Sequence, residues 1–144
     1  MKFFIGCDHG GYSVKSKVIQ ILESLGNEVK DLGTHSNQSV DYPDYAHKVC
    51  KSILSTPGSN GILICGTGIG MSITANRYKG IRAALCTDSY TASITKQHNN
   101  SNVLCFGQRV VGMGVIEDML RAWCKSEFEA GRHQARVEKI ENIT

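Results

Sequence analysis

The part of this sequence best suited to chemistry is a run of small residues that follows a cysteine. Residues 62–65 are the apolar stretch ILIC, and residues 66–72 are GTGIGMS. Glycines in such a turn let backbone N–H groups approach a ligand closely, and the start of a following helix favours negative charge. The same surroundings favour the thiolate form of a nearby cysteine. Cys65 could therefore be a nucleophile or a base, or a core cysteine beside a tight turn.

This glycine loop fits none of three known loop signatures. The P-loop requires a glycine, four residues and then Gly-Lys-Ser/Thr, and that spacing is missing here. The dinucleotide-binding fingerprint G-x-G-x-x-G begins at Gly66, but Met71 stands at its third glycine. A thiol phosphatase would need an arginine six residues after the cysteine, and that position is again Met71. The loop therefore predicts a site that stabilises negative charge, but it does not identify the ligand.

The elements that must position this loop follow from the hydrophobic pattern. Strands are predicted at 3–7, 28–32, 62–65, 81–86 and 102–106, and helices at 14–25, 44–54, up to 78 after the glycine loop, 90–96, 114–129 and 132–143. Such alternation predicts a parallel sheet covered by helices on both faces, with ligands bound beyond the carboxyl ends of the strands. The polar stretches 8–11, 66–72 and 88–90 should meet at that edge.

Composition and charge limit the classes of function. The 144 residues are expected to form one domain, 1–144. The net charge of +3 comes from scattered basic residues, which speaks against nucleic acid as a partner and is compatible with a small anionic substrate. No targeting segment and no apolar run of about 20 residues is present, so a cytoplasmic protein outside the membrane is expected.

The six cysteines match no zinc framework, and no metal site is expected from them. Five of them are expected to be core residues, and Cys65 is the exception. Because Cys7 and Cys65 end strands that should be neighbours, a redox pairing of the two thiols is an open alternative. Arg77 and Arg82 are expected to be solvated charges, and His133 a surface or supporting residue.

Six motifs in register resemble one family along nearly the whole chain. They are GCDHGG at 6–11, DYP at 41–43, ICGTGIG at 64–70, QHNN at 97–100, FGQRVVG at 106–112 and GRHQARV at 131–137. Together they resemble the family of ribose-5-phosphate isomerase B, which also contains galactose-6-phosphate isomerase subunits. The resemblance implies a Rossmann-like α/β/α sandwich with a five-stranded parallel sheet in the order 2-1-3-5-4.

The resemblance also implies an activity and an assembly. The reaction would interconvert ribose 5-phosphate and ribulose 5-phosphate through an enediolate, as in the non-oxidative pentose phosphate pathway, without metal or cofactor. The protein would be a homodimer, in some relatives assembled further to a tetramer, with active sites shared between subunits and the C-terminal helix on the partner. The alternatives are an isomerase of allose or galactose 6-phosphate, and a nucleotide-binding regulatory module of flavodoxin-like shape.

The residue roles that the resemblance implies begin at the glycine loop. Cys65 would be the base, because Met71 stands where some relatives carry a glutamate and cannot take a proton. Thr67 would position or deprotonate a hydroxyl. The enediolate oxygens would meet loop residues whose amides face the substrate, namely Gly66, Gly68, Ile69, Gly70, Met71 and Ser72.

The remaining roles lie elsewhere in the chain. His98 would open the furanose ring, since neutral imidazole moves protons near pH 7, and Asp8 would assist. Asn99 and Tyr42 would contact the sugar, with His98 and Asn99 coming from the neighbouring subunit. The phosphate would be bound by four basic residues, His9, Arg109, Arg132 and Arg136.

Overall fold

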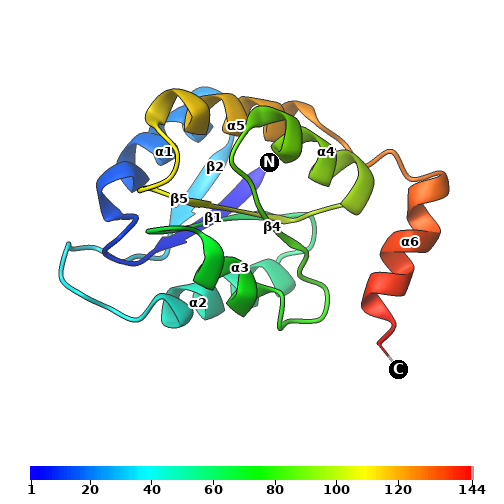
Figure 1. Ribbon diagram of the computed structural model, residues 1–144, viewed down its shortest axis with the longest axis horizontal. Coiled ribbons are helices and arrows are strands. Elements are labelled where there is room, and N and C mark those ends of the chain that lie inside the picture. Colours follow the sequence, from blue (N-terminus) through cyan, green and yellow to red (C-terminus); the bar gives the residue numbers. More distant parts are fainter. Residues whose placement is uncertain (144) are drawn as a thin grey trace.

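The fold is a parallel sheet between two layers of helices, and a computed structural model describes residues 1–143 of it (Figure 1). The described strands are β1 (Lys2–Cys7), β2 (Glu28–Asp31), β3 (Asn60–Cys65), β4 (Ala83–Leu85) and β5 (Val103–Gly107). They form one sheet in the order β2-β1-β3-β5-β4, and every pairing is parallel. The predicted fold class and strand order are confirmed; residue 144 of the expected domain lies outside the described part.

Helices follow the strands in regular alternation. They are α1 (Tyr12–Ser24), α2 (Tyr42–Leu54), α3 (Ile69–Ala75), α4 (Ser89–Asn99), α5 (Met113–Lys125) and α6 (Arg132–Glu141). α1, α4 and α5 cover one face of the sheet, and α2 and α3 cover the other (Figure 1). In the described part of the chain, no helix is long and apolar enough to cross a membrane.

The central strand β3 is buried along its whole length, as is expected for a parallel strand covered on both faces. Its alternate residues pack into two separate hydrophobic cores, one on each face of the sheet. Ile62 and Ile64 pack with the α1 and α5 side, where Trp123 is fully buried. Leu63 and Cys65 pack with α2 and α3. The end of β3, and the glycine loop after it, are thereby held from both sides.

Three predicted helices end early in the structure, at Ala75, Lys125 and Glu141, and the difference is largest for α5. The pattern predicted a helix over 114–129, but α5 ends at Lys125 and Ser126 has extended backbone angles. The N–H of Glu129 donates to the carbonyl of Gln97 over 3.0 Å, which ties the segment to the end of α4. Ala130 and Gly131 then take positive φ values of 55° and 51°, so the chain turns before α6. Tertiary contact with α4 prevails over the helical pattern here.

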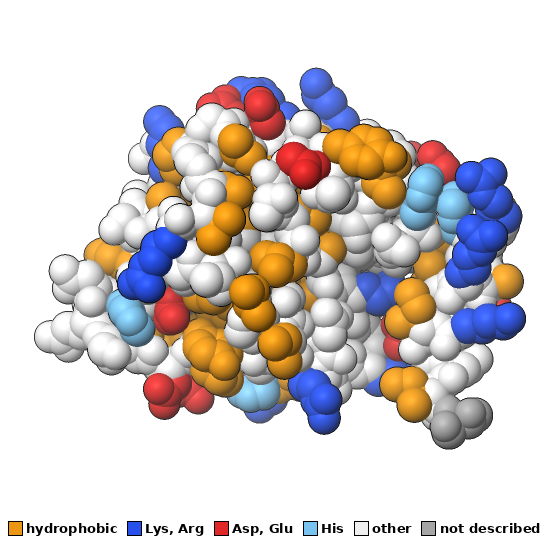
Figure 2. All heavy atoms as spheres, viewed as in Figure 1, with side chains coloured by type: hydrophobic (Ala, Val, Ile, Leu, Met, Phe, Trp, Pro, Cys, Tyr) orange, Lys and Arg blue, Asp and Glu red, His pale blue; other side chains and the backbone are white. Residues whose placement is uncertain are grey.

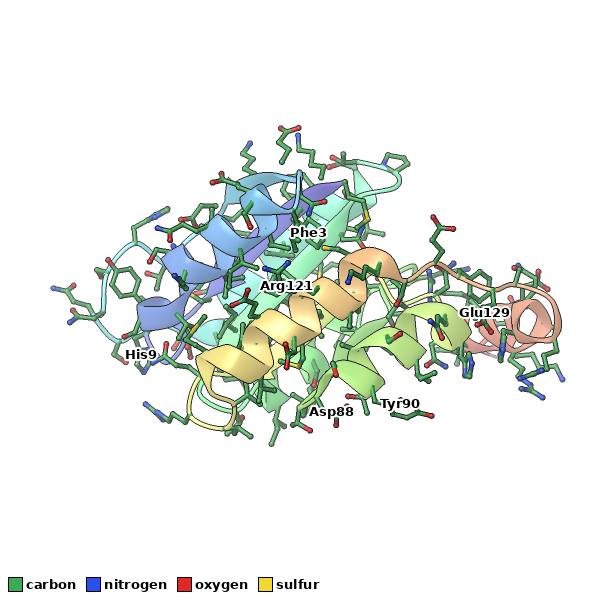
Figure 3. All side chains as sticks on the ribbon, turned by 90° about the horizontal axis from the view of Figure 1, so that it is seen from above. Phe3, His9, Asp88, Tyr90, Arg121 and Glu129 are labelled. Carbon is green, nitrogen blue, oxygen red and sulfur yellow. The ribbon has the colours of Figure 1, made fainter. Side chains whose placement is uncertain are left out.

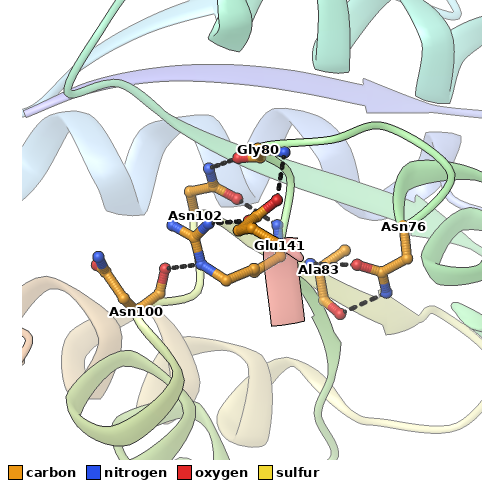
Figure 4. A network of polar contacts seen from close by, with 7 residues as sticks. Asn76, Gly80, Ala83, Asn100, Asn102 and Glu141 are labelled. Carbon is orange, nitrogen blue, oxygen red and sulfur yellow. Dashed lines mark hydrogen bonds and ion pairs between the residues drawn. The ribbon is translucent and has the colours of Figure 1, made fainter. Parts of the chain in front are cut away.

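The last helix, α6, stands away from the body of the molecule and packs against α4 (Figure 1). Its far end is held by Glu141, which accepts from Arg82 over 2.6 Å and from the N–H of Gly80 over 3.0 Å (Figure 4). Between α6 and the body lies a cavity of about 660 Å³, lined by residues that include Tyr78 and Ile140. Arg82 was expected to be solvated, but it is mostly buried in this ion pair.

Candidate active site

The carboxyl ends of β1, β3 and β5 meet at one edge of the sheet, and the loops after them are in close contact. A Cβ added at Gly10 would lie 2.8 Å from the nitrogen of Gly66. A Cβ at Gly107 would lie 2.4 Å from the Cα of Thr67. Only glycine permits this approach of one backbone to another. The loops of three strands therefore form one rigid floor, as the sequence pattern predicted for residues 8–11 and 66–72.

Cys65 ends β3 at the centre of this floor, with 5% of its surface exposed. Its Sγ accepts the backbone N–H of Gly68 over 3.1 Å. Gly68 has a φ of 80°, so the turn that points this N–H at sulfur requires a residue without a side chain. The Gly68 N–H therefore holds the sulfur against the glycine loop. The geometry thus suits a thiol that gives and takes a proton.

The other thiols lie in different surroundings. Burial raises the pKa of Cys7 to about 11 and that of Cys50 to about 12, so both stay protonated at neutral pH. Cys7 pairs with Ile64 across β1 and β3, and its side chain joins the core on the α1 and α5 side. Cys65 joins the opposite core. Because adjacent strand residues alternate between faces, the redox pairing of Cys7 with Cys65 is wrong.

Five cysteines were expected in the core, and the structure places four of them there. Cys7, Cys50, Cys86 and Cys105 are buried, whereas Cys124 is half-buried on α5. All six, including Cys65, carry free thiols.

The residues after β1 form one wall of the site. Asp8 is buried, and its carboxylate accepts the N–H of Gly10 over 2.8 Å, which fixes the turn. The Nδ1 atom of His9 accepts the N–H of Val40 over 3.2 Å, which leaves its Nε2 for a ligand. Tyr42 begins α2 nearby, and its ring lies so close to Gly70 that an added Cβ there would be 2.6 Å away. Asp8, His9 and Tyr42 therefore surround the glycine loop.

Arg109 places a positive charge at this edge of the sheet. Its backbone N–H donates to the carbonyl of Gly66 over 3.0 Å, and its guanidinium lies over the same glycine, 3.1 Å from where a Cβ would be. The hydroxyl of Thr67 accepts the N–H of Ile69 over 3.2 Å and is exposed to solvent. Met71 is fully buried beneath the loop.

The remaining predicted site residues lie at the other end of the molecule. α4 starts at the carboxyl edge after β4 and runs back toward the start of β5, so His98 and Asn99 end near the amino edge of the sheet. Arg132 and Arg136 lie exposed on α6, which packs against α4. In Figure 3, His9 lies at one end of the molecule and Glu129 at the other. One chain does not bring these four residues to Cys65.

Two neighbours of His98 were not identified from the sequence. The rings of His98 and His133 are stacked with centroids 4.1 Å apart, and Glu129 Oε1 lies 3.7 Å from His98 Nε2. Burial first, and then the charge of His98, lower the pKa of His133. No sequence signal pointed to Glu129, because the helical pattern placed it inside the predicted helix 114–129.

The polar stretch 88–90, also predicted at the carboxyl edge, has a structural role. Asp88 caps α4, and its carboxylate accepts the N–H of Thr91 over 2.7 Å. Such a cap satisfies a free helix N–H and typically contributes about 1 kcal/mol.

Comparison with known proteins finds relatives that match almost the whole chain. The profile of the family described as Ribose/Galactose Isomerase matches residues 3–140. Ribose-5-phosphate isomerase B of Escherichia coli is 46% identical over 142 residues, which cover 99% of this chain and 95% of that protein. The relative named ribose-5-P isomerase B in Listeria innocua is 42% identical and is covered to 97%.

Solved structures give the same result. Ribose-5-phosphate isomerase B of Clostridium thermocellum superposes with a TM-score of 0.95 at 50% identity, covering 98% of this chain and 95% of that one. The Thermotoga maritima ribose 5-phosphate isomerase also gives a TM-score of 0.95, at 46% identity and 99% and 98% coverage. Because the family profile matches residues 3–140 and the fold superposes closely on those of its relatives, the chain belongs to the ribose/galactose isomerase family.

Proposed function

We propose that this chain is an enzyme that interconverts D-ribose 5-phosphate and D-ribulose 5-phosphate through an enediolate. The observation that carries the proposal is the thiol of Cys65, buried at the end of β3 with the Gly68 N–H on its sulfur, in a chain of this family. The named relatives are ribose 5-phosphate isomerases, so a hexose 6-phosphate substrate is not favoured.

Cys65 acts as the base. Isomerisation requires one group that removes the proton from C2 of the aldose and returns it to C1. Within the glycine loop, Cys65 is the side chain suited to this, because Met71 is buried and has no proton to exchange. As the thiolate takes the C2 proton, the C2–H electron pair forms the C1=C2 double bond, and the carbonyl π pair moves onto the oxygen at C1 to give the enediolate.

The glycine loop stabilises the negative charge that develops on the substrate oxygens. Its amides are presented on a backbone that packs directly against the backbone at Gly10 and Gly107. Preorganised donors of this kind typically contribute about 3–4 kcal/mol each to the transition state. The exposed hydroxyl of Thr67 contacts a sugar hydroxyl, and the ring of Tyr42 borders the sugar.

The phosphate binds to basic side chains. His9 presents its Nε2 and Arg109 its guanidinium from the same chain, and arginine suits this because its fork holds two phosphate oxygens. Arg132 and Arg136 lie four residues apart on α6, so both can face one ligand. They reach it only from another copy of the chain.

The active form is a homodimer in which each site is built from two chains. His98, which opens the sugar ring, lies at the opposite end of its own chain from Cys65, and α6 stands off the body. Ile69 and Ile73 on α3 and Leu85 at the end of β4 are large apolar side chains that are 50%, 62% and 41% exposed. Figure 2 shows hydrophobic side chains gathered over the middle of one face. A second copy seated there would cover these side chains and supply His98.

The test is an isomerase assay on the purified chain. Ribose 5-phosphate should be converted to ribulose 5-phosphate at an undiminished rate in excess chelator, because no step in this mechanism uses a metal. Allose and galactose 6-phosphates serve as comparison substrates in the same assay. Faster turnover of either hexose phosphate would contradict the proposed substrate, and complete loss of activity in chelator would contradict the proposed chemistry.

A further inference from the structure

Three side chains that can bind a metal meet where α4, the segment 126–131 and α6 join. The ligand atoms of His98, Glu129 and His133 all lie within 4.8 Å of one another. Glu129 Oε1 is 3.7 Å from His98 Nε2 and 3.6 Å from His133 Nε2. Both separations are too long for hydrogen bonds, so the three groups do not satisfy one another.

The inner member of the cluster lacks a partner. His133 is 6% exposed, and its Nε2 is the one fully buried side-chain nitrogen or oxygen without a hydrogen bond among the residues the structure describes. A buried polar atom in this state typically costs about 1–3 kcal/mol. An ion placed between the three side chains would bind this nitrogen.

Two imidazole nitrogens and one carboxylate oxygen form the ligand set of many zinc sites, with water in the fourth position. We propose that His98, Glu129 and His133 bind a divalent transition-metal ion such as Zn²⁺, and that the bound ion inhibits the enzyme. Inhibition follows because an ion bound by the His98 imidazole occupies the ring that the proposed mechanism uses to open the sugar. This second half rests on the proposed function.

The distances between the ligand atoms are close to those expected around a bound zinc ion. Ligands at about 2.0–2.1 Å from a tetrahedral Zn²⁺ lie roughly 3.3–3.4 Å apart, within a few tenths of an ångström of the two oxygen–nitrogen distances. The stacked rings, inclined by 15°, cannot both point at one ion. The His98 side chain is 34% exposed and can turn, whereas His133 is held by burial. Metal binding therefore draws His98 out of the stack.

The backbone fixes the cluster, and nearby charges limit its affinity. The N–H of Glu129 donates to Gln97 over 3.0 Å, and the N–H of His133 donates to Ala130 over 2.9 Å. Arg132 and Arg136 lie on the same helix as His133 and disfavour a cation. The single negative charge of Glu129 offsets one of them. We therefore expect binding that a chelator reverses.

The first experiment measures binding without reference to activity. Metal-free protein is titrated with Zn²⁺ in competition with a chromophoric chelator. Wild type should bind one ion per chain, and Glu129→Gln and His133→Gln should each bind at least about tenfold more weakly. Glu127→Gln is the matched control, since Glu127 is an exposed residue of the same segment. Equal affinity in wild type and Glu129→Gln would overturn the site.

Cobalt identifies the ligands. Co²⁺ bound by nitrogen and oxygen in a tetrahedral site gives visible absorption, which Glu129→Gln should reduce. A strong thiolate-to-cobalt charge-transfer band would show that a cysteine holds the ion, and would overturn the assignment.

The second experiment tests inhibition. Zn²⁺ should abolish ribose 5-phosphate isomerisation in wild type and Glu127→Gln at concentrations that fill the site, and chelator should restore it. Glu129→Gln is compared with its own metal-free rate, and it should keep that rate at the same zinc concentration. Equal inhibition of Glu129→Gln and wild type would overturn the inhibitory role. Absence of isomerase activity before zinc is added would instead contradict the proposed function, while the binding titration still decides the site.

Discussion

Placing Cys65→Ala and His98→Asn on separate chains of one dimer tests whether each site is built from two chains. The two residues lie at opposite ends of a chain, because α4 runs from the carboxyl edge of the sheet back to its amino edge. Each variant alone should lose roughly 10²-fold or more in turnover, the usual contribution of a proton-transfer group.

The magnitude follows from counting sites in a two-fold dimer. In the hybrid of the two variants, one site contains both substitutions and the other contains an intact Cys65 with an intact His98. The hybrid should therefore show about half of the wild-type rate per dimer, although both parent variants are nearly inactive.

The assay uses coexpressed chains with two different affinity tags, so that hybrids are purified from both tags in sequence. The matched control carries the same two substitutions on one chain, paired with a wild-type chain. Each site of that dimer contains one substitution, so its rate should fall to background. Sites formed within single chains would give the reverse, with an inactive hybrid and a half-active control, and that outcome would refute the two-chain site.

Three further predictions concern single chains. Cys65→Ser should lose about 10²–10⁴-fold in kcat while calorimetry shows substrate still binding, and retention of a tenth of the activity would exclude this thiol as the base. Gly107→Ala should reduce both activity and thermal stability, because its Cβ would lie 2.4 Å from Thr67 Cα, whereas Gly112→Ala meets no atom within 4 Å and should do neither. Burial lowers the pKa of Lys96 to about 8, so the folded chain releases this proton before the unfolded chain does. As the pH rises from about 8 to 10.5, denaturant titrations should show the free energy of unfolding of wild type increasing relative to that of Lys96→Met. A difference between the two proteins that stays constant over this pH range would count against the lowered pKa.

Local patterns in the sequence were enough to predict most of the elements. The alternation of apolar strands with helical periodicity predicted every strand within a few residues, because burial on both faces of a parallel sheet imposes that pattern directly. The helix predicted over 114–129 was too long, since the hydrogen bond from Glu129 to Gln97 is made between residues distant in sequence.

Part of the candidate site could also be predicted from the sequence, and part could not. The grouping of Cys65 with the glycine loop was visible in the sequence because these residues are consecutive and end a strand. The fit of that loop against Gly10 and Gly107 depends on strand register, which the sequence alone does not reveal.

Taken by itself, the sequence determined the parallel α/β sheet, the motifs of the family and the thiol before the glycine loop, because each depends on residues close together along the chain. Tertiary structure decided that Cys7 and Cys65 face opposite cores, that Arg82 is buried against Glu141, and that His133 stacks on His98. These contacts join residues from separate elements, and they arise only when strand order and helix packing set the faces that meet.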